Sequence, residues 1–207
     1  MEKLDLTKRY KTYYTAKTTP ELVDIEPAQF LALTGKGDPS GLPFSEKLQA
    51  LYATAYAIKF ECKQSGRDFT VPKLECLWWY DEHHFGRLSM SETPLDVPRS
   101  QWEYRQLIRM PEYITGEDVR KGIESIRAKK KSDLVTDIEL YRIAPGKSAQ
   151  ILHIGPFSKE PESLIKLAEF METKKLERNG LHHEIYLSDF RKTAPEKLRT
   201  ILREPVK

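Results

Sequence analysis

This sequence contains little cysteine, and it shows neither the pattern of a signal peptide nor a long apolar run. The 207 residues include two cysteines, Cys62 and Cys76, both in apolar periodic segments. Two cysteines cannot build the disulfide framework of a small secreted protein, so buried, reduced thiols are expected. Residues 1–5 lack an apolar signal core, and no apolar stretch is long enough to cross a bilayer. These absences predict a cytoplasmic protein without a membrane partner.

The sequence also lacks an excess of one charge. It carries 34 Lys and Arg against 31 Asp and Glu, a net charge of +3. One basic block, residues 129–131, closes a predicted helix, where cations complement the helix dipole. Nucleic-acid binding needs many phosphate contacts, so we interpret this block as a solvated helix end and expect no nucleic-acid partner.

Signatures of metal and nucleotide chemistry are missing as well. The pairs His83-His84 and His182-His183, with His153, are the histidines available for a metal. Adjacent strand histidines face opposite ways and cannot readily chelate one ion, and no zinc-binding spacing is present. A nucleophile elbow and a phosphate loop are absent too, which disfavours serine-hydrolase and nucleotide chemistry. We therefore expect no metal site and no cofactor.

The hydrophobic pattern predicts alternating strands and helices. Alternation and β-branched or aromatic content indicate strands at residues 23–35, 73–80, 102–108, 137–143, 150–154 and 182–187. Helical periodicity indicates one helix that ends at Ser65-Gly66 and a second that begins at Thr115. A third helix is expected from Pro161 to Asn179-Gly180. A short C-terminal helix is expected from Thr193, with Leu198, Ile201 and Leu202 buried.

These elements occur twice, after a polar, tyrosine-rich N-terminal arm of residues 1–20. The segment Ala28-Gln29-Phe30-Leu31, followed by a Gly turn and a helix, is echoed by Ala149-Gln150-Ile151-Leu152. In each half the helix precedes a strand with a glutamate in apolar company, Glu75 and Glu184. The expected fold class is α+β: one domain of residues 21–207, with pseudo-symmetric halves at about 21–111 and 112–207. Glu75 and Glu184 are predicted symmetry mates near a shared cleft, where small-molecule sites usually lie.

The most informative segment is residues 181–189, which places a carboxylate inside an apolar strand. Strand alternation puts Glu184 and Tyr186 side by side on one face. A strand glutamate is costly to bury without a partner. Two interpretations remain open: Glu184 is paired with a nearby cation, or it lies in an apolar cleft as an acid, a base or a counter-ion.

Aromatic residues gather where that cleft is expected. Trp79, Trp102, Tyr104 and Tyr141 lie on three predicted strands. Aromatics at strand spacing are often core residues. The tryptophans, however, have polar or charged neighbours, and flat rings near a carboxylate suit a planar aromatic guest, especially a cationic one. The pattern thus allows these four residues to be either core residues or the walls of a ligand cleft.

Five segments carry a family resemblance. They are Asp-Ile-Glu-Pro-Ala-Gln-Phe-Leu-Ala at 24–32, Leu-Glu-Cys-Leu-Trp-Trp at 74–79, Trp102-x-Tyr104 running to Pro111, Leu-His-Ile-Gly-Pro-Phe at 152–157, and His-Glu-Ile-Tyr-Leu-Ser-Asp at 183–189. Together they resemble the stand-alone GyrI-like small-molecule-binding proteins, from about residue 20 to the C-terminus. Two departures are Cys76, where glycine is expected, and Phe190, where proline is expected.

The resemblance implies two pseudo-symmetric β-α-β-β modules around a central cleft. In related drug-sensing domains a strand glutamate meets cationic aromatic drugs, a role that would fall to Glu184. Some stand-alone members open the cyclopropane of cyclopropanoid DNA-alkylating antibiotics. The resemblance thus implies a detoxifying hydrolase for planar, hydrophobic, genotoxic molecules.

In that hydrolase Glu184 would position or deprotonate water. Tyr186 would orient the carboxylate or donate to the substrate carbonyl. Substrate would be bound by Glu75, Trp79, Trp102, Tyr104 and Tyr141. The alternative is a non-catalytic multidrug-binding protein for aromatic or cationic ligands. A gyrase partner rests on the family name alone, and the sequence leaves monomer and homodimer open.

Overall fold

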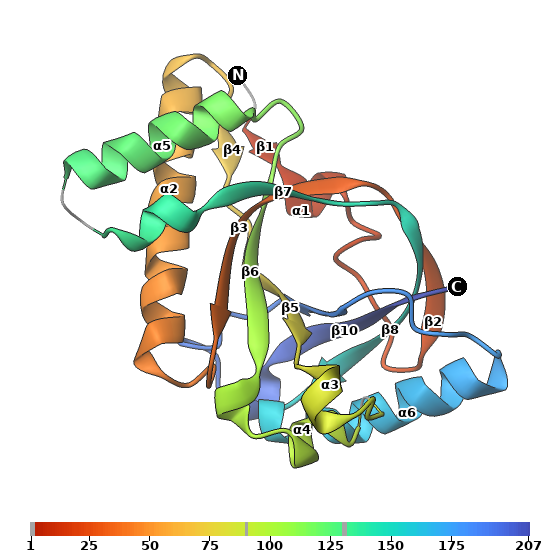
Figure 1. Cartoon of the computed structure of the whole chain (residues 1–207). Helices are drawn as coiled ribbons and strands as arrows, with labels where there is room; N and C mark the ends of the chain where they lie inside the picture. Colours follow the sequence, from red (N-terminus) through yellow and green to blue (C-terminus); the bar gives the residue numbers. More distant parts are fainter. Residues whose placement is uncertain (1–2, 90, 130–131) are drawn as a thin grey trace.

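The computed structural model describes residues 3–89, 91–129 and 132–207, and within them one curled eight-stranded antiparallel sheet carries the helices (Figure 1). The α+β fold class is confirmed. Along the sheet the strands run β2 (Glu21–Ile25), β8 (Gly146–Ile154), β10 (Arg199–Val206), β9 (His182–Tyr186), β5 (Glu75–Trp79), β6 (Glu103–Met110), β3 (Ala28–Lys36) and β7 (Glu139–Ile143).

The strand order contains two copies of one module. The first is β3-α2-β5-β6, with α2 at Leu42–Gln64, and the second is β8-α6-β9-β10, with α6 at Glu160–Thr173. The central strands β5 and β9 pair with each other and join the modules. The strand that precedes each module crosses to the far edge of the other, so that β2 pairs with β8 and β7 pairs with β3. The predicted pair of β-α-β-β modules is therefore confirmed.

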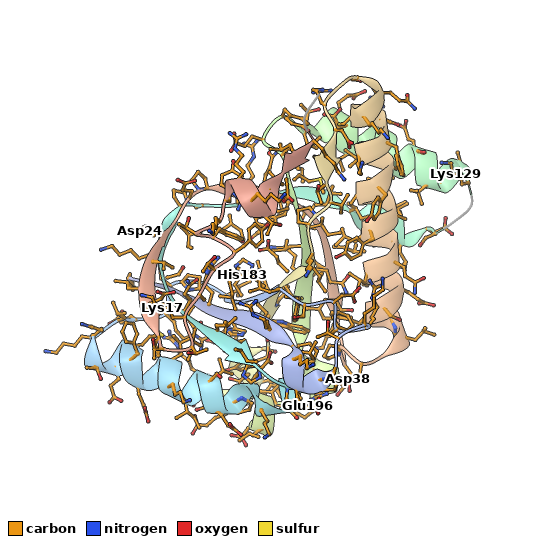
Figure 2. All side chains as sticks on the ribbon, turned by 180° about the vertical axis from the view of Figure 1, so that it is seen from behind. Lys17, Asp24, Asp38, Lys129, His183 and Glu196 are labelled. Carbon is orange, nitrogen blue, oxygen red and sulfur yellow. The ribbon has the colours of Figure 1, made fainter. Side chains whose placement is uncertain are left out.

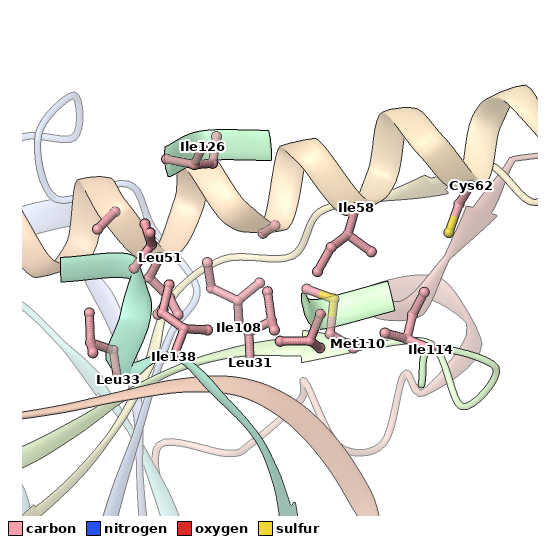
Figure 3. Packing of buried hydrophobic residues seen from close by; sticks show 14 of the residues in the cluster. Leu31, Leu33, Leu51, Ile58, Cys62, Ile108, Met110, Ile114, Ile126 and Ile138 are labelled. Carbon is pink, nitrogen blue, oxygen red and sulfur yellow. The ribbon is translucent and has the colours of Figure 1, made fainter. Parts of the chain in front are cut away.

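Strand alternation gives the sheet two faces. We call one the helix face, because α2 covers its β3–β6 side and α6 covers its β8–β10 side. Figure 3 shows Leu51, Ile58 and Cys62 of α2 pointing toward residues of the sheet such as Leu31 and Ile108. Since α2 and α6 cover the two ends of this face, its middle, formed by β5 and β9, lies between them.

Helix α5 (Gly116–Ala128) packs against α2 and contacts the edge strand β7. The predicted start is confirmed, because Thr115 and Asp118 form a reciprocal capping box. Close packing depends on Gly122, where an added Cβ would lie 2.7 Å from Ile58 Cγ1. In the described residues no helix has the length and apolarity needed to span a membrane. Lys130 and Lys131, expected to close this helix, lie outside the described residues.

We call the other side of the sheet the arm face, because residues 10–17 cover it. The N-terminal segment starts with β1 (Leu4–Asp5), which pairs in parallel with β4 (Phe69–Thr70), and continues through α1 (Leu6–Arg9). Tyr13 and Tyr14 are buried against the arm face. The arm is thus packed into the core. The domain boundary expected between residues 20 and 21 stays a prediction.

Several predicted boundaries differ in the structure. The expected C-terminal helix is wrong: residues 195–197 form one turn, and β10 follows. Both faces of β10 are buried, so its apolar residues do not alternate with polar ones and resemble a helical stripe. The strand expected at 23–35 is divided at Glu26-Pro27 into β2 and β3, which have different neighbours. Helix α6 ends at Thr173, before the predicted Asn179-Gly180.

The two Ala-Gln-x-Leu segments place their glutamines on opposite faces of the sheet. Gln29 lies on the helix face and donates to the carbonyl oxygens of Pro111 and Ile114. Gln150 lies on the arm face and accepts two hydrogen bonds from Arg203. A shift of one residue along a strand exchanges its faces, so these two glutamines are not structural equivalents although the modules are.

Candidate active site

A cavity of about 540 Å³ opens on the helix face between α2 and α6, with β5 and β9 as its floor. Its volume lies in the range of small-molecule sites, roughly 300–1,000 Å³. Aromatic walls come from both modules: Phe44, Trp78, Trp102, Phe157, Tyr186 and Phe190. A hollow of about 90 Å³ on the other side of Tyr186 and Phe190 is too small for a polycyclic ligand.

Alternation in β9 supplies the polar floor of the cavity. His182, Glu184 and Tyr186 point to the helix face, whereas His183 and Ile185 point to the arm face. The predicted pairing of Glu184 with Tyr186 is confirmed, because the Tyr186 hydroxyl donates to Glu184 Oε2 at 2.5 Å. The other carboxylate oxygen, Oε1, lies 3.4 Å from His182 Nε2. Glu184 keeps 14% of its side chain exposed, and its oxygens retain lone pairs for a further donor.

His182 lies between two glutamates. Its Nδ1 bonds Glu204 Oε1 from the neighbouring strand β10, and Glu204 is fully buried. Arg178 Nε lies 3.6 Å from the other oxygen of Glu204. Burial by itself opposes charge on the imidazole, but the charge of Glu204 and the hydrogen bonds that the imidazole donates to both glutamates raise the pKa of His182 to about 10. His182 is therefore an imidazolium at neutral pH and donates from both ring nitrogens.

Two further acids of the cavity have pKa values shifted toward the protonated form. Burial, reinforced by the charge of Glu184, raises the pKa of Tyr186 well above 10, so Tyr186 acts as a donor and not as a base. Burial and the same charge raise the pKa of the Glu160 carboxyl well above its usual range. Within the described part of the chain, Glu160 Oε1 is buried without a hydrogen-bond partner.

The aromatic walls surround this floor. Trp78 stacks on Phe44 with ring centroids 6.0 Å apart and meets the edge of Trp102 at 5.8 Å. Phe157 and Phe190 contact Tyr186 edge-on, at 5.9 and 6.3 Å. The indole Nε1 of Trp78 is buried and has no acceptor among the described residues.

The predicted site residues fall into two groups. Glu184, Tyr186 and Trp102 line the cavity with their side chains. Trp79 borders the cavity, but its indole lies on the arm face, where the guanidinium carbon of Arg105 is 5.9 Å from the ring centroid. Tyr104 lies on the same face but beneath the wall: it is buried against Phe44 and Trp78, and its ring occupies the space where a Cβ on Gly35 would be.

Glu75 and Tyr141 lie on the arm face and do not line the cavity. Tyr141 is covered there by Arg105, whose guanidinium carbon lies 4.2 Å from the ring centroid. The prediction that Glu75 and Glu184 share a cleft is wrong, because Glu75 pairs with Ile185 while Cys76 pairs with Glu184.

On the arm face Glu75 is fully buried and belongs to a separate network. It accepts hydrogen bonds from the Tyr13 hydroxyl at 2.5 Å and the Tyr14 hydroxyl at 3.2 Å, and its Oε2 lies 2.9 Å from His183 Nε2. Figure 2, which views the molecule from behind, labels His183 in the interior. A buried carboxylate with three partners needs no ligand to satisfy it.

Sequence reasoning missed His182, Glu204, Arg178 and Glu160. The alternation that placed Glu184 also places His182 on the same face. Glu204 follows from β10, which sequence periodicity assigns to a helix. Buried reduced thiols are confirmed for Cys62 and Cys76. Across residues 3–89, 91–129 and 132–207, no three His, Cys, Asp or Glu side chains form a group suited to a metal ion.

Comparisons with known proteins agree with this architecture. A model of the GyrI-like small-molecule-binding domain matches residues 110–207. An uncharacterized conserved protein from Listeria innocua is 37% identical, with a TM-score of 0.87 over 99% of this chain and 100% of that chain. A hydrolase from Listeria innocua is 35% identical, with a TM-score of 0.83 over the same shares of both chains.

A more distant structure shares the fold alone. The EcmrR C-terminal domain is 12% identical, with a TM-score of 0.56 over 91% of this chain and 97% of that domain. None of the curated proteins compared with the chain matches it.

Proposed function

Because the chain belongs to the GyrI-like small-molecule-binding family, we propose that its cavity takes up planar, hydrophobic, genotoxic molecules and hydrolyses the cyclopropane of cyclopropanoid DNA-alkylating agents. One observation carries the proposal: the Glu184 carboxylate lies on the floor of an aromatic cavity, with Tyr186 and His182 holding its two oxygens. The 35% identity to a hydrolase over nearly the whole chain supports a hydrolytic reaction. We place this detoxifying activity in the cytoplasm.

In the proposed reaction Glu184 is the general base. The oxygen of a water molecule bonds to the methylene carbon of the cyclopropane as a carbon–carbon bond of that ring breaks. The released electron pair moves into the conjugated carbonyl, whose oxygen then takes a proton from solvent. Glu184 accepts the proton that the water loses and returns it to solvent, so the net change is addition of one water.

Tyr186 is a positioning residue in this scheme. A tyrosine has one O–H, and that of Tyr186 is donated to Glu184 Oε2. Of the two roles implied for Tyr186, orientation of the carboxylate is therefore favoured over donation to the substrate. We assign the carbonyl contact to Trp78, whose buried Nε1–H has no acceptor among the described residues; the indole has to turn this N–H into the cavity when substrate binds.

The reaction needs only modest acid–base assistance. Strain in the three-membered ring supplies much of the driving force, and a positioned general base contributes about 10²–10⁴-fold. Stacking on Trp78, Trp102 and neighbouring rings would add about 0.5–1.5 kcal/mol for each aromatic pair beyond area burial.

Product analysis tests the proposal. The protein is incubated with an excess of a cyclopropanoid alkylator, and the products are identified by mass spectrometry. We expect a product one water heavier than the substrate, formed in excess over protein. Recovery of unchanged alkylator from a tight complex would favour the second candidate function instead.

That second candidate is a non-catalytic multidrug-binding protein. It is favoured by the same contacts at Glu184, since a carboxylate with a phenol on one oxygen and an imidazolium on the other is also a satisfied structural pair. Such a protein would sequester planar molecules with the aromatic walls alone. The cavity would then bind the alkylator without changing it.

A further inference from the structure

We propose that His182 makes this cavity select neutral over cationic ligands, in contrast to the glutamate-to-cation contact that the family resemblance assigns to Glu184. The inference rests on the proposed function only insofar as the cavity is taken as a ligand site. It does not depend on turnover, and it names the charge class of the ligand.

The charged groups around His182 are already paired with one another. Glu184 from the same strand meets the imidazole at Nε2, and Glu204 from β10 meets it at Nδ1. Glu204 is also close to Arg178, at 3.6 Å. Each of the two glutamates on the floor therefore has a cation of the protein beside it.

Three further ionisable residues line the cavity. Glu160, at the start of α6, is held toward its neutral form by burial and by the charge of Glu184. Glu82 and Arg99, on the segment between β5 and β6, are exposed to solvent. With Glu160 neutral, the described residues that line the cavity carry three carboxylates against three cations, counting the imidazolium.

A cationic guest would therefore find no free counter-ion at the floor. It would lie beside the His182 imidazolium, and it would lose its hydration without a new carboxylate partner. A neutral polycycle meets neither cost and gains the same aromatic contacts. The positive charge of His182 thus acts as the discriminating element.

The next residue in the chain provides a matched control. His183 has the same side chain, but it lies on the arm face and is bonded to Glu75, remote from the cavity lining. Replacing either histidine with glutamine keeps a side chain that can donate a hydrogen bond. Only the change at position 182 removes charge from the cavity.

The test uses two probes of one shape, neutral N-methylacridone and cationic N-methylacridinium, titrated against tryptophan fluorescence. We expect the protein to bind the neutral probe at least about tenfold more tightly. His182→Gln should improve the relative affinity for the cation by about tenfold or more, because it exposes an unpaired carboxylate. His183→Gln should leave the ratio of the two affinities unchanged.

Arg178→Gln provides a second reading that does not require His182→Gln to fold. The Arg178 side chain is 23% exposed, and its loss removes the cation that lies 3.6 Å from Glu204 Oε2, so the ratio should shift toward the cation by a smaller factor. Preference for the cation in the unmodified protein overturns the inference and leaves the cavity as a ligand site. An unchanged ratio in every folded variant overturns it too. If neither probe binds, the proposed function is itself contradicted, because the cavity is then not a site for planar aromatic ligands.

Discussion

His182 and His183 are consecutive residues of β9 that bond different glutamates on opposite faces of the sheet. His182 meets Glu204 and Glu184 at the cavity floor, and His183 meets Glu75 under the N-terminal arm. One strand therefore supports two separate polar networks, one open to ligands and one sealed in the core. Variants in the two networks should have different consequences.

Glu184→Gln should lower turnover of a neutral cyclopropanoid by about 10²-fold or more while its affinity changes little. The substitution keeps the size of the side chain but removes its basicity, which matters in the transition state and not in the ground state. Tyr186→Phe should cause a smaller loss, since the tyrosine positions the carboxylate. Single-turnover rates and Kd values measured with one substrate check both variants. Undiminished turnover in Glu184→Gln would exclude the proposed mechanism even if the protein is a hydrolase.

Trp78→Phe should reduce turnover by about tenfold to a hundredfold, because it removes the N–H proposed to meet the substrate carbonyl. The ring that remains preserves most of the stacking surface, so affinity should fall much less. Trp79→Phe is the matched control, as the Nε1 of Trp79 already donates to Glu103. Equal losses of turnover in the two variants would contradict a special role for Trp78. The measurement is kcat and Kd for each variant.

The stability of the protein should fall as pH rises from about 6.5 to about 10, the ordinary and folded pKa values of His182. Below this window both the folded and unfolded states are protonated at this residue, and its full contribution is present. Within it the unfolded state loses the proton while the folded state keeps it, so the free energy of unfolding decreases.

Urea unfolding across this window checks the expectation. In His182→Gln the decline should be shallower, because the group that titrates differently in the two states has been removed. A decline of the same slope in both proteins would show that His182 is not the titrating group.

Tyr13→Phe should destabilise the fold by about 1–3 kcal/mol, because it removes a buried donor to the fully buried Glu75. Binding in the cavity should be unaffected, since Tyr13 lies on the arm face. Tyr10→Phe is the control: its hydroxyl bonds Glu112 in an exposed position, so the change should stay within about 0.5 kcal/mol. Urea unfolding gives the stabilities, and probe titration tests the cavity. Weakened probe binding in Tyr13→Phe would contradict the prediction, because it would mean that the arm-face network affects the cavity.

Local pattern was sufficient for some of the site. Side chains two residues apart in a strand point to the same face, whatever strands lie beside it. The sequence alone therefore places Glu184 and Tyr186 together. The same period, followed one step back, includes His182. The capping box at Thr115 and Asp118 is also local, and it was predicted correctly.

The positions of Glu75 and Glu204 could not be predicted from the local sequence pattern. Glu75 has the same kind of neighbours in sequence as Glu184, yet its face depends on the register of β5 against β9, which places Ile185 opposite it. A shift of one residue would have reversed the outcome. Glu204 lies in a strand buried on both sides, where the apolar pattern carries no period of two.

The sequence by itself determined the α+β class, the repeated order of strands and helices and the alternation in β9, because each of these depends on residues close together in the chain. Only the tertiary structure decided that Glu75 lies under the N-terminal arm and that Glu204 and Arg178 complete the floor around His182. Those contacts join residues from different strands, and their geometry is set by strand register and by the packing of α2 and α6 on one face. The charge balance of the cavity, and with it the ligand class we propose, depends on those long-range contacts.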